Sequence, residues 1–63
     1  MYRLEVFYKG ERTPHATIEL RKAAEVLSRI SELLAEHHTC EHILVTFQNT
    51  RLFAVDCAGN RLP

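Results

Sequence analysis

The chain has 63 residues, of which 46% are hydrophobic and 25% charged, and eight basic residues balance eight acidic ones. This length allows a single domain, residues 1–63, and the balanced charge disfavours nucleic acid as a partner because phosphate contacts need a basic surface. Two cysteines, no signal peptide and no apolar run of membrane-spanning length lead us to expect a cytoplasmic protein with reduced thiols and no membrane contact.

The first segment alternates apolar and polar side chains, which predicts a strand with one apolar face formed by Tyr2, Leu4, Val6 and Tyr8. Gly10 follows and predicts a turn over residues 9–12. Residues 13–19 have two interpretations. They either lead into a second strand over residues 16–20, or they begin the helix with Thr17 as its N-cap. The fold is accordingly ββαββ or βαββ, and the β-branched Thr17 and Ile18 favour the additional strand.

Residues 20–38 show the spacing of an amphipathic helix. Apolar residues recur at three- and four-residue steps, and this stripe comprises Leu20, Ala23, Ala24, Val26, Leu27, Ile30, Leu33 and Leu34. The opposite side is charged or polar, and neither Gly nor Pro interrupts the segment. We therefore expect an α+β domain with two layers, in which one long helix packs on a small antiparallel sheet.

Two further strands follow the helix, over residues 41–48 and 51–57, with Asn49-Thr50 as the expected turn and residues 58–63 as a loose tail. A two-residue loop places Ile43, Val45, Phe47, Leu52 and Ala54 under the helix. A three-residue loop with a bulge instead brings Phe53, Val55 and Cys57 into the core and leaves Leu44, Leu52 and Ala54 outside.

One helix covers only one face of a sheet, so the other face stays open in a monomer. Adopting the two-residue loop, we predict that this open face binds a partner through Phe7, Leu44, Thr46, Phe53 and Val55. The predicted function is a non-enzymatic protein-interaction module, a small regulator or inhibitor that binds a partner protein or forms a homodimer through its open sheet face or an edge strand. A sheet this small leaves little room for a substrate pocket, so we expect no small-molecule substrate and no cofactor.

Two alternatives rest on particular residues. Residues 37–42 hold three histidines and a cysteine, and a zinc site is conceivable from His38, Cys40, His42 and Cys57. The spacing matches no zinc-finger signature, so a helix end with dipole-compatible histidines and a buried cysteine is the simpler interpretation. The second alternative is a small nucleic-acid-binding domain that uses strand aromatics and arginines, although no known binding signature is present.

Overall fold

The computed structural model describes residues 1–63 and places two strands before the helix, which confirms the favoured interpretation of residues 16–20 as a strand. β1 (Tyr2–Phe7) and β2 (Ala16–Leu20) are antiparallel, with Tyr2 opposite Leu20 and Val6 opposite Ala16. Gly10 has a positive φ of 84°, and the Glu11 amide donates to the Tyr8 carbonyl over 3.1 Å. The turn therefore lies one residue earlier than predicted, and glycine adopts its left-handed backbone without strain.

The helical segment is shorter than the predicted range of residues 20–38. A single 3-10 turn, η1 (Ala23–Glu25), leads into α1 (Val26–Glu36). Leu20 belongs to β2, where its backbone pairs with β1, so it is not available to the helix. Lys22 occupies the N-cap of η1 and makes no side-chain cap, so the sequence offers no sharp start signal there.

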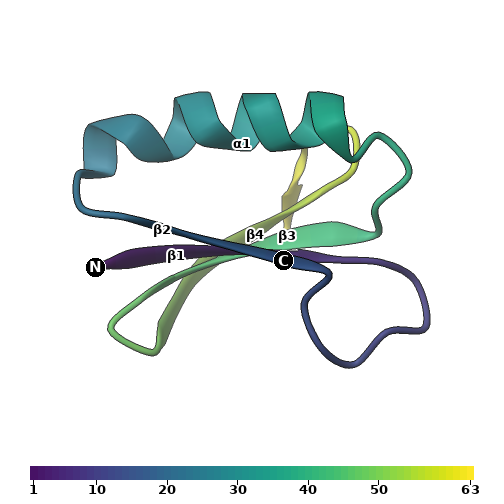
Figure 1. Cartoon of the computed structure of the whole chain (residues 1–63), viewed down its shortest axis with the longest axis horizontal. Helices are drawn as coiled ribbons and strands as arrows, with labels where there is room; N and C mark the ends of the chain where they lie inside the picture. Colours follow the sequence, from purple (N-terminus) through teal and green to yellow (C-terminus); the bar gives the residue numbers. More distant parts are fainter.

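Three strands follow the helix: β3 (His42–Phe47), β4 (Thr50–Asp56) and β5 (Arg61–Leu62). All pairs are antiparallel in the order β2-β1-β3-β4-β5, and α1 lies across one face of the sheet (Figure 1). The prediction of a loose tail over residues 58–63 is wrong. The Asp56 carboxylate accepts the Ala58 amide at 3.0 Å and the Asn60 amide at 2.9 Å, and this turn returns the chain so that β5 pairs with β4.

The β3–β4 hairpin differs from both predicted loops. Its turn is Gln48-Asn49, one residue earlier than expected, and both residues have positive φ, 50° and 67°, as a type I′ turn requires. The register then shifts between Val45 and Thr46, which leaves Leu52 as the extra, unpaired residue of a β-bulge. After the bulge Phe53 lies opposite Val45, so the last part of β4 has the parity predicted for the bulged loop.

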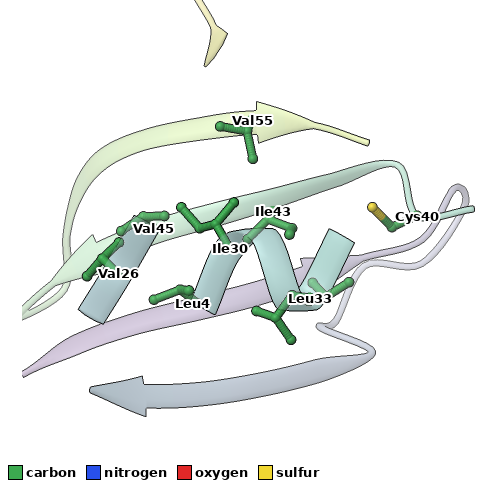
Figure 2. Close-up of a cluster of buried hydrophobic side chains, with 9 residues drawn as sticks. Leu4, Val26, Ile30, Leu33, Cys40, Ile43, Val45 and Val55 are labelled. Carbon is green, nitrogen blue, oxygen red and sulfur yellow. The ribbon is translucent and has the colours of Figure 1, made fainter. Parts of the chain in front are cut away.

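The core lies between α1 and the central strands β1 and β3. Val26, Ile30 and Leu33 of the helix face these strands, whereas Val55 on β4 lies to one side of the helix (Figure 2). Four sheet side chains are 0% exposed, namely Leu4, Val6, Ile43 and Val45. The helix thus covers the middle of the sheet. It leaves the side of the sheet formed by β4 more accessible to solvent, and we call this side the β4 margin.

Candidate binding groove

The face of the sheet opposite the helix carries three of the five predicted partner-binding residues: Phe7, Leu44 and Thr46. The Phe7 ring stacks on the His42 ring with 4.8 Å between centroids. Leu44 lies between Glu5 of β1 and Ala54 of β4. All three predicted residues are half-buried, and charged side chains such as Glu5 lie among them. This face is therefore mixed in character.

The other two residues, Phe53 and Val55, do not belong to that face, so the prediction of one shared surface is wrong for them. Val55 lies opposite Ile43 on the helix side of the sheet and is buried in the core. Phe53 lies opposite Val45 and is half-buried at the margin of the same side. The cause is the bulge at Leu52, which changes the parity of the strand from that point onward.

An apolar groove lies on the helix side, between the beginning of the helical segment and the β4–β5 margin. It holds about 310 Å³, and seven of its eight lining residues are hydrophobic. We call it the Leu27–Leu52 groove; its lining residues are Tyr2, Ala23, Val26, Leu27, Val45, Leu52, Phe53 and Arg61. Val26 and Val45 lie close together at the start of α1 (Figure 2).

Two leucines on opposite sides of this groove are unusually exposed. Leu27 of α1 is 69% exposed and Leu52 of β4 is 48% exposed, although both were expected to have apolar neighbours. Leu27 is at the edge of the helix stripe, since the stripe is centred on Val26, Ile30 and Leu33. Leu52 is the bulge residue, so it and Phe53 line the groove as consecutive side chains.

One cation lies over the groove. The Arg61 guanidinium carbon is 4.2 Å from the centroid of the Phe53 ring, a cation–π contact that holds the side chain over the apolar lining. Nothing in the sequence marks Arg61 as part of a site, because its position depends on β5, which was predicted to be a loose tail. The exposure of Leu27 was not predicted either, because its spacing places it within the apolar stripe, whereas in the structure Val26 and Leu33 are the buried residues.

The four residues of the zinc alternative are not all brought together: the Cys40 and Cys57 thiols are neighbours, but the two histidine side chains do not complete a site with them. Cys40 is buried in the core, whereas the His42 ring stacks on Phe7 on the opposite face of the sheet. The Cys57 thiol donates to the His38 carbonyl at 2.9 Å, so that contact uses the backbone of His38. No three His, Cys, Asp or Glu side chains are arranged to hold one metal ion. The side chains near the C-terminal end of α1 therefore make structural contacts and do not form a metal site.

Those contacts join the helix end to the sheet. The Tyr8 hydroxyl and the His37 Nδ1 atom are 2.8 Å apart, and the Cys40 amide donates to the His37 carbonyl at 2.9 Å. Burial, together with the neighbouring Cys57 thiol, raises the pKa of Cys40 from 9.0 to about 11. A thiol with a raised pKa is a poor nucleophile near neutral pH, so Cys40 has the properties of a core residue.

The strand aromatics do not form a platform for stacking bases. Tyr2 and Phe47 contact one another with 4.6 Å between ring centroids on the helix side, and Phe53 lies under Arg61. On the open face, Phe7 is already stacked on His42. The aromatic residues cited for the nucleic-acid alternative thus contribute mainly to the core and its margin.

Comparisons with protein-family models, curated proteins and solved structures find no match to this chain. No helix in the structure has the length and apolar character needed to cross a membrane.

Proposed function

We propose that this protein is a non-enzymatic protein-interaction module and that the Leu27–Leu52 groove is its binding surface. The observation that carries the proposal is the pair of exposed leucines, Leu27 and Leu52, on either side of an apolar groove of about 310 Å³. Exposed apolar surface with a concave shape favours binding of another protein's side chains, because burying such surface is worth about 25 cal/mol per Å².

The chemistry of the lining favours binding over catalysis. Tyr2 and Arg61 are the only ionisable side chains in the groove, and neither has a neighbouring carboxylate or imidazole there to act as an acid–base partner. Catalytic sites instead gather several titratable groups around a reacting atom. The sheet face that carries Phe7, Leu44 and Thr46 is the competing surface, and the experiment below separates the two.

The test is selection of short random peptides against the wild-type protein and three variants. Leu27→Gln and Leu52→Thr remove apolar surface from the groove while retaining helix and strand propensity. Leu44→Thr is the matched change on the opposite sheet face. Circular dichroism melting of all four proteins controls for folding.

We expect peptides that bind the wild-type protein and Leu44→Thr with similar affinity, and that bind each groove variant at least about fivefold more weakly. Peptides that lose affinity only for Leu44→Thr would place the binding surface on the open sheet face. If no selected peptide binds the wild-type protein more tightly than it binds the groove variants, the groove is rejected as the binding surface.

A further inference from the structure

The Arg61 side chain is oriented without a carboxylate partner. Its guanidinium lies over Phe53, and the four ion pairs within the chain involve other residues. A guanidinium has five N–H donors in a planar fork that matches a carboxylate. Stacking on Phe53 fixes the plane of that fork, which lowers the entropy cost of pairing with an incoming acid.

The residues next to the groove carry an excess of positive charge, although the whole chain is neutral. Lys22 directly precedes Ala23 of the groove in the chain and the Arg61 guanidinium lies over Phe53, which makes two cations; Arg51 precedes Leu52 but pairs with Thr46 on the other face of the sheet. Glu25 is the one acidic residue that adjoins a lining residue in the sequence. Lys22 takes part in none of the ion pairs within the chain.

We infer that the groove takes a segment of a partner protein in which large apolar side chains stand beside an aspartate or glutamate, with the apolar side chains entering between Leu27 and Leu52 and the carboxylate pairing with Arg61. This inference rests on the proposed function of the groove. The apolar lining supplies most of the buried area, while the cations at the edge select an acidic neighbour and repel a basic one.

Two other occupants fit the observations less well. In a symmetric dimer through this groove, the same surface of each copy meets the other, so the two apposed surfaces would both carry the excess of positive charge. A nucleic acid would place polar phosphates against a surface in which seven of eight lining residues are hydrophobic. A protein segment with both apolar and acidic side chains matches the apolar lining and also pairs with the cations at the edge of the groove.

The experiment measures peptide affinity by fluorescence anisotropy, using peptides with amidated C-termini selected on the wild-type protein. The protein variants are Arg61→Glu, Arg61→Lys and, as a matched charge reversal at an exposed site in the β1–β2 connection, Arg12→Glu. Each selected peptide is also made with its acidic residue changed to Asn or Gln, and with that residue changed to Lys. Melting curves control for loss of the Arg61–Phe53 contact.

We expect the selected peptides to be enriched in Asp or Glu next to large apolar residues. Arg61→Glu should weaken binding by about tenfold or more, Arg61→Lys by less, and Arg12→Glu by under about twofold. The Lys-substituted peptide should bind Arg61→Glu better than the acidic peptide does, because the charges are then exchanged across one pair.

Selected peptides without acidic residues, with unchanged affinity for Arg61→Glu, would overturn this inference while leaving the groove function standing. Single-stranded oligonucleotides that bind through Arg61 in the absence of any peptide binding would overturn it in favour of nucleic acid. A dimer detected by sedimentation and lost in Leu27→Gln would overturn it in favour of a second copy. Absence of any groove-dependent peptide would instead contradict the proposed function itself.

Discussion

Leu27 and Leu33 show how strongly the surroundings of one residue type differ on a single helix. Both belong to the predicted apolar stripe, yet Leu27 is 69% exposed and Leu33 is 2% exposed. Leu33 lies on the side of α1 that packs in the core, whereas Leu27 lies on the side of α1 that lines the groove. The same side chain thus stabilises the fold at one position and is available for binding at the other.

Alanine substitutions at these two leucines should therefore have unequal effects. Leu33→Ala creates a cavity in the core and should lower the free energy of unfolding by about 2–5 kcal/mol. Leu27→Ala removes exposed surface and should change it by less than about 0.5 kcal/mol. Urea denaturation followed by circular dichroism measures both changes. Equal losses of stability in the two variants would contradict the assignment of Leu27 to the surface.

Cys40 predicts a decline of stability in alkaline solution. The pKa of its thiol is about 11 in the folded protein, compared with an ordinary 9.0 for the exposed group. Below the lower value both states hold the proton; as pH rises above it, the unfolded chain ionises first and gains free energy relative to the folded state. The free energy of unfolding should consequently fall by up to roughly 2–3 kcal/mol between these two pKa values.

The matched variant for that measurement is Cys40→Ala, which lacks the titrating thiol. All other side chains are common to the two proteins, so the informative quantity is the difference between the two pH profiles. The profile of the variant should be flatter over the same interval. Identical slopes in wild-type protein and Cys40→Ala would show that burial of the thiol does not govern the alkaline loss.

The β3–β4 hairpin sets the position of the groove at the scale of the elements. Its turn places Gln48 and Asn49 at positive φ, and the adjacent bulge at Leu52 turns two consecutive apolar side chains toward the helix side. Glutamine is an unusual choice at such a backbone conformation, which costs on the order of 1 kcal/mol. This hairpin therefore combines a strained turn with the feature that exposes Leu52.

Replacing the turn with Asn-Gly, by Gln48→Asn together with Asn49→Gly, should stabilise the protein by about 1 kcal/mol because these residues adopt positive φ more readily. Gln48→Val should destabilise it, since a β-branched residue is strained there. Thermal melting compares the three proteins. A lower melting temperature for the Asn-Gly variant than for wild type would contradict the turn assignment.

The sequence was sufficient to predict the helix, the strand pair after it and the two-layer architecture, and it favoured β2 over an earlier helix start, because period-two and helical apolar spacings depend on local residues. The helix start was placed too early, since Leu20 fits both an apolar stripe and the β2 ladder. β5 was missed because two residues contain no periodic signal, and its turn depends on the Asp56 carboxylate.

The predicted binding face failed for a related reason. A one-residue bulge reverses the parity of a strand, and no residue type in β4 specifies where the bulge occurs. As a result Phe53 and Val55 were assigned to the wrong side of the sheet, while Leu52 and Arg61 were not recognised as lining residues of one groove. The groove is a product of tertiary packing, which alternation patterns do not report.

At the scale of the whole molecule, the core is small and does not extend to the β4 margin of the sheet. Ten of 63 residues are buried, and the single helix covers the central strands while the β4 margin remains accessible. A core of this size supplies about 3–5 kcal/mol, so binding a partner in the groove would also stabilise the fold through mass action. Homodimerisation through the open sheet face stays a prediction that sedimentation at several concentrations checks.

The central claim is that partners bind at the Leu27–Leu52 groove and not on the open sheet face. The most direct measurement is nitrogen-15 NMR of the labelled protein during titration with a selected peptide. We predict that the largest amide shift changes occur at Leu27, Leu52 and Phe53, with small changes at Phe7 and Leu44. Shift changes concentrated at Phe7, Leu44 and Thr46 would contradict the claim and place the binding surface on the opposite face.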